Sequence, residues 1–406
     1  MLNLPKNIWV MSVVMSLSFA STAMMVLIAG LIGSTIAPDP SMATLPYAVV
    51  IIGTACATIP AAMLMQRIGR KMGVLVGLCI ALTAAALAIY AVNIEHFWLF
   101  VLASFLLGTN AAFAQQGRFI ILENAVGLKQ QADGLTLALL ANLMAAFIGP
   151  WMGQYGKILL NSYTWAHADF SGSFILLIAL LLFACLSLTQ YQELPRSVSL
   201  ETKTGRSMKE IIRQPHFLVA AGSAAFGFAI MAFVMTATPV SMHKVQGHTL
   251  EHTTLVIQTH IVAMFLPSLL TGRLLKLGLN SSLLFSGFTI YLIMCSVAYS
   301  GEHVLHYWWA LLLLGVGWNL IFMTSTTRLG HTHAPIEKFK AQAGNDFLVF
   351  GFQAIAAFSS GLVLYASGWS GVITVAIVMT LCWIFMLTVL LLIKPDKHLQ
   401  PNTELK

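Results

Sequence analysis

The sequence contains few charged residues. Only 9% of its 406 residues are Asp, Glu, Lys or Arg, whereas 58% are apolar. Because an ordinary soluble domain carries about 25% charged residues, this chain has too little charge to cover a surface that faces water. Apolar stretches recur along the whole chain, each close to the ~20 residues that a helix needs to cross a ~30 Å hydrocarbon core. The composition therefore excludes a soluble multi-domain protein.

The chain also lacks the motifs of several chemical functions. Its five cysteines lie in apolar stretches and form no C-x-x-C pair, which argues against a disulfide framework or a zinc site. No G-K-[ST] sequence occurs, so nothing supports direct use of ATP. His243, His248 and His252, with Glu251 nearby, match no strong metal motif, and we interpret them as a solvated loop. No nucleophile–base set is evident, so the sequence predicts neither an enzyme nor a bound metal or cofactor.

Twelve stretches have the length and apolarity of transmembrane helices. The first, Ile8–Ile36, is longer than the ~7–15-residue core of a signal peptide, and we expect it to be retained. Only helices and closed barrels satisfy the backbone in lipid, and stretches this long are helices. The sequence thus predicts an all-α membrane protein with helices at residues 8–36, 45–65, 73–92, 97–122, 134–160, 173–192, 216–239, 253–271, 279–299, 307–327, 346–366 and 371–393.

The basic residues lie on one side of these predicted helices. All 21 Lys and Arg residues except Lys157 and Lys244 fall on the side of the N-terminus. Because positive residues favour the cytoplasmic side, both termini are expected in the cytoplasm. The expected location is the bacterial inner membrane, which the chain would cross many times. This distribution explains the net charge of +7 without a nucleic-acid partner. The expected partners are the lipid bilayer and a small-molecule substrate, and the chain is expected to act as a monomer.

A polar linker divides the chain into two halves. Residues 193–214 form the longest polar connection, and they separate two sets of six predicted helices, at 1–192 and 215–406, the second of which ends in a short cytoplasmic tail. A proline followed by two basic residues spaced i, i+3 occurs in both halves: Pro60, Arg67 and Arg70, and Pro267, Arg273 and Lys276. Two related bundles that meet at a site in the middle of the membrane are typical of secondary transporters.

Residues 62–71, A-M-L-M-Q-R-I-G-R-K, resemble the signature loop G-x-x-x-D-R-x-G-R-K of the major facilitator superfamily. The sequence keeps the R-x-G-R-K part, but Ala62 replaces the first glycine and Gln66 replaces the acid. In the family, this acid meets the N-terminus of helix eleven and latches two six-helix bundles together on the cytoplasmic side. Gln66 can form a hydrogen bond there but brings no charge, so the resemblance implies a weaker latch.

The resemblance implies a set of residues for this cytoplasmic latch. The family's loop arginine pairs with an acid at the cytoplasmic end of helix four, which implies a pair between Arg70 and Glu123. The position of Asp346 indicates the N-cap of helix eleven. The alternative is that the basic residues only anchor the topology. The full latch set is Gln66, Arg67, Gly69, Arg70, Lys71, Glu123 and Asp346.

Other segments resemble particular branches of the superfamily. Residues 149–153, G-P-W-M-G, resemble the G-P-x-x-G-G motif of antiporters, although Gln154 replaces the last glycine. A kinked and closely packed helix explains the same residues. Residues 115–123, 238–274 and 345–351 together resemble a bacterial branch that includes riboflavin carriers.

Polar residues within the predicted helices are candidates for the substrate site, because such groups usually face a cavity or a partner. In the superfamily, helices one, four, seven and ten line the cavity. Arg118 is expected on one helix face with Gln115. It could bind an anionic or carbonyl group of the substrate, or it could instead pair with another residue of the protein. The Trp318 ring could stack on a flat substrate while the Asn319 amide reads its polar edge, or both could only pack helices. The candidate set is Asn110, Gln115, Arg118, Trp318, Asn319 and Gln353.

His260 is the titratable group of most interest in the predicted helices. Histidine changes charge near neutral pH, so His260 could couple proton binding to substrate binding. It could equally be a neutral hydrogen-bond partner between two helices. No acid lies at the middle of a predicted helix, so a carboxylate relay for protons is either absent or located at helix ends.

Together these features predict a secondary active transporter that moves a small organic solute, such as the vitamin riboflavin, across the inner membrane by alternating access. Uptake is favoured, with protons as a candidate coupling ion. One alternative is a proton-coupled multidrug efflux antiporter. An alternative of another class is a membrane receptor or scaffold that does not transport, although the tails are short for such a role.

Overall fold

The structure consists of helices joined by short loops. This computed structural model describes residues 4–159, 170–193, 205–334 and 337–393, in which there are helices but no strand, and this confirms the predicted all-α fold. The N-terminal elements are α1 (Lys6–Ile36), the 3₁₀-helix η1 (Pro40–Met42), α2 (Leu45–Ile68), α3 (Arg70–Asn93), α4 (Phe97–Gln115), α5 (Gly117–Asn124), α6 (Gly127–Leu159) and α7 (Ser171–Thr189). The C-terminal elements are α8 (Met208–Ile212), α9 (Pro215–Pro239), the π-helix η2 (Val240–Val245), α10 (Leu250–Phe265), α11 (Ser268–Lys276), α12 (Asn280–Tyr299), α13 (Val304–Gly330) and α14 (Lys338–Ile393).

The long helices have the length and apolarity required to cross a membrane. Ten segments of the described chain meet this requirement. The last of them, at 340–392, contains Gly368, whose φ of 66° and ψ of −169° are not helical, so α14 consists of two helices in succession. The 33-residue helix α6 is a further long helix. Ten segments, α6 and the division of α14 together give the twelve helices that the sequence predicts.

Two helices that the sequence predicts as continuous are interrupted. The fourth is divided at Gln116 into α4 and α5. A Cβ atom at Gly117 would lie 2.2 Å from the sulfur of Met15, so the glycine allows α5 to pack closely on α1. The eighth predicted helix is divided into α10 and α11 at Pro267, which has no N–H to donate. Arg118 therefore lies beyond a break in its helix, and its expected common face with Gln115 is not part of one regular helix.

The predicted start of helix eleven is wrong. α14 begins at Lys338, because residues 338–343, K-F-K-A-Q-A, are mostly good helix formers. Asp346 therefore lies inside the helix and is not its N-cap. Its carboxylate accepts a hydrogen bond from the Asn345 side chain at 3.1 Å.

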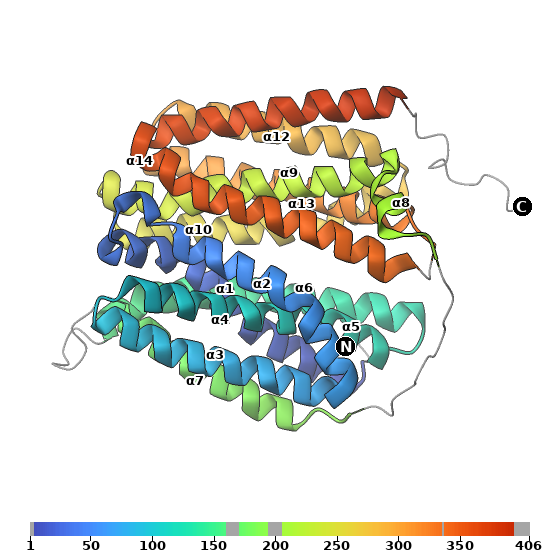
Figure 1. Ribbon diagram of the computed structural model, residues 1–406, viewed down its shortest axis with the longest axis horizontal. Helices are drawn as coiled ribbons and strands as arrows, with labels where there is room; N and C mark the ends of the chain where they lie inside the picture. The colour runs from blue at the N-terminus through green and yellow to red at the C-terminus, as the bar shows by residue number, and fades with distance from the viewer. Residues whose placement is uncertain (1–3, 160–169, 194–204, 335–336, 394–406) are drawn as a thin grey trace, which may run out of the picture.

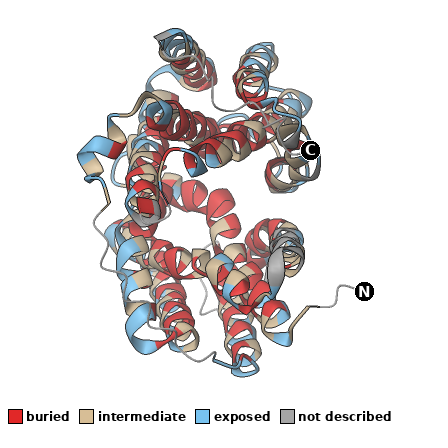
Figure 2. Cartoon of the chain, turned by 90° about the vertical axis from the view of Figure 1, so that its right-hand side faces the viewer, coloured by how far each residue is buried: buried red, intermediate tan, exposed pale blue. Residues whose placement is uncertain are grey.

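The helices form two groups that lie one above the other in Figure 1. Helices α1 to α7 pack mainly on one another, as do α9 to α14, and the two groups meet through α2 on α14, α6 on α10 and α1 on α9. We call the surface along which these three pairs meet the seam. Within the described chain, α1 and α9 are among the most deeply buried helices. Figure 2 shows buried residues between the helices and exposed ones on the outside of each group.

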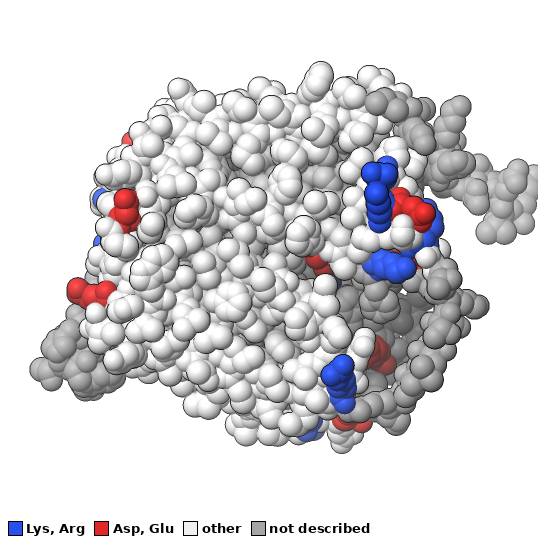
Figure 3. Space-filling view, viewed as in Figure 1, with Lys and Arg blue, Asp and Glu red and all other residues white. Residues whose placement is uncertain are grey.

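Charged side chains gather at the two ends of the molecule. Figure 3 shows a broad band between the ends with almost no charged residue, as a segment in contact with hydrocarbon requires. Large apolar side chains such as Phe385 and Leu392 are exposed on the outside of the helices. We call the end at which α2, α5, α7 and α13 finish the basic end, because it carries Arg67, Arg70, Lys71, Arg118 and Arg206.

Hydrogen bonds join the two groups of helices at the end opposite the basic end. The Thr44 hydroxyl donates to the carbonyl of Phe358 at 3.2 Å and accepts from the N–H of Gly361 at 3.2 Å. Lys244 donates to the Thr35 hydroxyl at 3.3 Å. From this junction, the basic ends of α2 and α14 diverge (Figure 1). The seam is therefore held together at the opposite end.

Candidate transport site

The loop between α2 and α3 is built around an ion pair. Gly69 has a φ of 96°, a conformation that favours glycine, and it turns the chain directly into α3. The Arg70 guanidinium then forms two hydrogen bonds with Glu123, one of them from Nε to Oε2 at 3.0 Å. This is the pair that the family resemblance implies, and it joins α3 to the end of α5.

A second carboxylate in this network was missed by the sequence analysis. Glu193 accepts hydrogen bonds from the backbone N–H groups of Arg70 and Lys71, both at 2.8 Å, where the helix dipole favours a negative charge. The Lys71 ammonium in turn donates to the carbonyls of Thr189 and Tyr191, at 3.0 and 2.8 Å. The start of α3 and the end of α7 thus cap each other. In the sequence, Glu193 looks like the first residue of a solvated linker.

Apart from Asp346, which lies within α14, the latch set separates into two parts in the structure. Gly69, Arg70, Lys71 and Glu123 lie together in the network just described. Gln66 and Arg67 are exposed in the last turn of α2 and form no hydrogen bond or ion pair with a described residue. These two side chains are therefore free to contact another surface at the basic end.

The C-terminal group has its own buried carboxylate at the basic end. Glu337 accepts from the backbone N–H of Arg206 at 2.7 Å and from its guanidinium at 2.8 and 2.7 Å. These bonds, together with one from the backbone N–H of Ala334, lower the pKa of Glu337 to about 2. Lys340 also donates to the Arg206 carbonyl at 3.2 Å. This cluster fastens the end of the linker to the start of α14, and sequence reasoning missed it because Arg206 looks like a linker residue.

Arg118 and Asp346 carry opposite charges on the two helix groups at the basic end. Arg118 is exposed at the start of α5, where its guanidinium lies 4.8 Å from the ring centroid of Phe119. Asp346 is half-buried in α14. The two charges attract each other, but no hydrogen bond or close ion pair joins them within the described chain. Arg118 thus lies at the basic end of the seam with its donors uncommitted.

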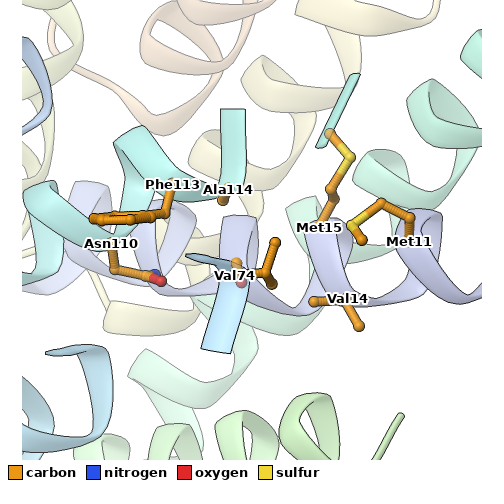
Figure 4. Close-up of a pocket in the computed structure, with 8 residues that line it drawn as sticks. Met11, Val14, Met15, Val74, Asn110, Phe113 and Ala114 are labelled. Carbon is orange, nitrogen blue, oxygen red and sulfur yellow. The ribbon is translucent and has the colours of Figure 1, made fainter. Parts of the chain in front are cut away.

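Asn110 lies in a small buried cavity between α1, α3 and α4 (Figure 4). The cavity has a volume of about 10 Å³, close to the minimum that one water molecule needs. The side-chain Nδ2 of Asn110 has no partner in the described chain. The surrounding residues are Met11, Val14, Met15, Ser18, Val74, Phe113 and Ala114. The structure therefore places Asn110 inside the N-terminal group, whereas Gln115 is half-buried at the end of α4.

Trp318 lies in a cluster of aromatic rings near the seam. It stacks on Phe322 with ring centroids 4.8 Å apart and an interplanar angle of 10°, and it meets the edge of Phe228 at 5.0 Å. The ring is 5% exposed, and its Nε1 has no hydrogen-bond partner among the described residues. Trp318 thus combines a flat apolar face with an unused donor.

Asn319, its neighbour, has a different environment. Its Nδ2 donates to the Met264 carbonyl and to the Ser268 hydroxyl, both at 2.7 Å, and its Oδ1 accepts from Thr271 at 2.8 Å. Met264 lies in the last turn of α10, where helix carbonyls need partners from outside the helix, and the Asn319 amide binds its carbonyl. The amide that we expect to read a substrate edge is therefore already occupied by α10 and α11.

His260 and Gln353 are both buried in the C-terminal group. His260 is fully buried, and its Nδ1 lies 2.8 Å from the carbonyl of Leu311 on α13, while its Nε2 has no partner in the described chain. This geometry fits the alternative of a neutral hydrogen bond between helices. Gln353 on α14 is 7% exposed and forms no hydrogen bond with a described residue.

The glycines of residues 149–153 face α1. A Cβ atom at Gly149 would lie 2.6 Å from the carbonyl oxygen of Ala20, and one at Gly153 would lie 2.8 Å from Ile28. Both glycines thus allow α6 and α1 to pack closely, as small residues do between transmembrane helices. This contact supports the packing interpretation of the segment that resembles the antiporter motif.

Comparison with known proteins identifies the family. Residues 9–344 match the Major Facilitator Superfamily. The riboflavin transporter RfnT of Brucella anthropi is 30% identical over 400 residues, which cover 98% of this chain and 96% of RfnT. An uncharacterized transporter of the same superfamily, YddS of Bacillus subtilis, is 28% identical over 381 residues, covering 87% of this chain and 86% of YddS.

Two solved structures show the same fold. A bacterial homologue of the human lysosomal transporter Spinster superposes with a TM-score of 0.71 at 12% identity and 95% coverage of both chains. The nucleoside transporter NupG superposes with a TM-score of 0.73 at 10% identity, covering 94% of this chain and 99% of NupG. The matched residues, the full-length relative and the twelve-helix fold agree, and the chain belongs to the major facilitator superfamily of small-solute transporters.

Proposed function

We propose that this protein imports riboflavin, or a solute with a similar flat ring, across the bacterial inner membrane by alternating access. The observation that carries the proposal is the seam, where two helix groups are joined at one end and diverge at the other. Such an arrangement is one state of a carrier whose halves move against each other around a central site. The riboflavin transporter RfnT, 30% identical over almost the whole chain, supports this choice of solute.

We place the basic end in the cytoplasm, with both termini, because positive residues favour that side. With this orientation, α2 and α14 diverge towards the cytoplasm, and the hydrogen-bonded junction between them lies on the outer side. The moving units are residues 1–192 and 215–406, with the linker at 193–214 between them. In this state, the solute can be released into the cytoplasm. Entry of the solute from the outside requires the hydrogen bonds of Thr44 to break, so that this end opens. One chain contains the entire seam, so a monomer is sufficient.

For the coupling ion, protons are the candidate, and Asp346 is better placed than His260 to respond to them. Asp346 is half-buried at the basic end of the seam opposite Arg118, whereas His260 is fully buried between α10 and α13. Efflux is not part of the proposal, because the glycines of residues 149–153 are accounted for by close packing on α1.

Solute counterflow in proteoliposomes tests the transport function. Liposomes that contain the purified protein and a high concentration of riboflavin are diluted into a trace of labelled riboflavin. A carrier produces transient accumulation of label above that of empty liposomes, without any ion gradient. Absence of counterflow for riboflavin, nucleosides and other flat solutes would overturn the proposal. Repeating the assay as uptake, with and without an imposed pH gradient, tests proton coupling.

A further inference from the structure

Five aromatic rings from four helices meet at the seam. They are Phe19 of α1, Phe228 of α9, Phe265 of α10, and Trp318 and Phe322 of α13, and we call them the aromatic box. Phe19 and Phe265 come from different helix groups, and their ring centroids lie 5.8 Å apart at an angle of 83°. The box therefore spans the two groups that move against each other during transport.

Trp318 is the most buried member of the box and contacts three of its four phenyl rings. Phe19, Phe228, Phe265 and Phe322 are all partly exposed, whereas Trp318 is 95% buried. The distances from Trp318 to Phe228, Phe265 and Phe322 are 5.0, 6.3 and 4.8 Å between centroids. Only Phe322 is parallel to the indole, which shows that the Trp318 face accepts a stacked aromatic ring.

The indole N–H of Trp318 distinguishes this ring from three other tryptophans that are buried or partly buried. Nε1 of Trp318 is buried and has no acceptor within the described chain. Three other indoles donate hydrogen bonds at 3.0–3.2 Å: Trp308 to Thr259, Trp369 to Ala298 and Trp383 to Ser223. A buried donor without an acceptor destabilises the protein, and such a group requires an explanation. A ligand that brings a hydrogen-bond acceptor into the box would explain why this donor is left without a partner.

We propose that the aromatic box binds a planar heteroaromatic ring, and that Trp318 Nε1 donates a hydrogen bond to an acceptor at the edge of that ring. This inference rests on the proposed transport through the seam, and it names the part of the solute that the seam recognises. The phenyl rings supply apolar faces, and stacking on them tolerates a range of ring systems. The single donor selects rings whose edge carries a carbonyl oxygen or an unprotonated nitrogen.

The pair Trp383 and Phe226 provides a matched control. These rings stack with centroids 4.6 Å apart at 18°, much as Trp318 stacks on Phe322. However, Trp383 joins α14 to α9 inside the C-terminal group, and its indole N–H already donates to Ser223. Substitution of Trp383 therefore perturbs a stacked, buried tryptophan without changing the aromatic box.

The experiment measures riboflavin binding to the purified protein through quenching of flavin fluorescence. Trp318→Phe keeps a ring but removes the donor, and it should weaken binding about threefold to tenfold. Trp318→Leu also removes the stacking face, and it should weaken binding by more than roughly tenfold. Trp383→Phe should leave the Kd within about twofold of the wild type. Lumichrome, which has the tricyclic ring without the ribityl chain, should compete with riboflavin, whereas ribitol should not.

The outcomes separate this inference from the transport function itself. Riboflavin counterflow by the wild type, together with unchanged binding in both Trp318 variants, would overturn the aromatic box as a ring site and leave the transporter intact. Competition by ribitol but not lumichrome would do the same. Loss of binding in Trp383→Phe equal to that in Trp318→Phe would assign the effect to general packing and also overturn the inference. Absence of counterflow in the wild type would instead remove the proposed function.

Discussion

Arg118 of α5 and Asp346 of α14 attract each other across the seam at the basic end, although no close ion pair joins them in this state. The pair includes one residue from each helix group. The nearby loop has Gln66 where the superfamily signature has an acid, so the signature position brings no negative charge to the seam. Asp346, on α14 of the C-terminal group, provides a carboxylate at the basic end. The attraction therefore offers a way to bring the two groups together when the basic end closes.

Neutralising this pair should slow transport. In Asp346→Asn, the closed state of the basic end loses a charge-assisted contact, and riboflavin uptake should fall roughly threefold to tenfold. The double variant with Arg118→Asp and Asp346→Arg should recover part of that loss, because the attraction is restored with reversed polarity. Uptake rates in proteoliposomes provide the measurement. Arg213→Gln removes an exposed charge at the same end and serves as the control. If uptake by the double variant were slower than uptake by Asp346→Asn, the pairing would be wrong.

Gly69 should be required for stability of the loop between α2 and α3. Its φ of 96° is costly for any other residue, so Gly69→Ala should destabilise the protein by about 1–2 kcal/mol and lower its Tm. Gly330→Ala at the end of α13 is the matched control, because no atom lies within 4 Å of the added Cβ and its φ is not in the positive range. Thermal unfolding in detergent compares the two variants. Equal Tm values for both would show that the loop tolerates a different conformation.

The sequence contains enough information to place the helices and one ion pair. Long apolar stretches locate all twelve helices, because each must satisfy its backbone within lipid. The pair between Arg70 and Glu123 could be predicted because the family pairs its loop arginine with an acid at the end of helix four, and both positions are matched here. The start of α14 was not predicted correctly, because Asp346 looks like a capping residue. Only the helix-forming tendency of the residues before Asp346 indicates the longer helix.

Contacts between distant residues account for most of what sequence reasoning missed. Glu193 and Glu337 both lie in or beside polar segments, so the capping role of Glu193 and the burial of Glu337 depend on helices brought together only by the fold. Asn319 has the same limitation, since its three partners lie about 50 residues earlier in the chain. For Trp318, the sequence suggests a stacking face, but only the three-dimensional structure shows that its N–H has no acceptor among the described residues.

Asn319 should act as a structural residue of the C-terminal group. Asn319→Ala would remove the amide that binds the Met264 carbonyl and the Ser268 hydroxyl, and it should cost about 1–3 kcal/mol of stability. The Kd of the folded variant for riboflavin should remain within about threefold of the wild type. Thermal unfolding and fluorescence titration measure the two quantities separately. A large loss of affinity with an unchanged Tm would restore Asn319 to the substrate site.

Gly361 should be needed to close the end opposite the basic end. A Cβ atom here would lie 2.5 Å from the Thr44 hydroxyl and 3.0 Å from the carbonyl oxygen of Ser41, so Gly361→Ala should force α14 away from α2. We expect slower uptake and a smaller fraction of molecules closed at this end. Gly351→Ala, on the same helix with no atom within 4 Å of the new Cβ, should transport like the wild type. Labelling of a cysteine introduced at Ala43, which is buried beside this junction in the present structure, reports the opening, and equal labelling in both variants would argue against this role.

The contact between Glu337 and Arg206 should make stability depend on pH in the acid range. The folded-state pKa of Glu337 is about 2, below the ordinary value of 4.5, so ionised Glu337 stabilises the folded protein above pH 4.5. This stabilisation should decrease as the pH falls from about 4.5 to about 2, because the unfolded carboxyl then binds a proton more readily than the folded one. Glu337→Gln should therefore lower the Tm at pH 7, and its difference from the wild type should shrink at pH 3. Glu95→Gln, which changes an exposed carboxylate with no hydrogen-bond partner in the described chain, should leave the pH dependence as it is. A Tm difference for Glu337→Gln that stays constant from pH 7 to pH 3 would mean that the ionised carboxylate is not the source of the stabilisation.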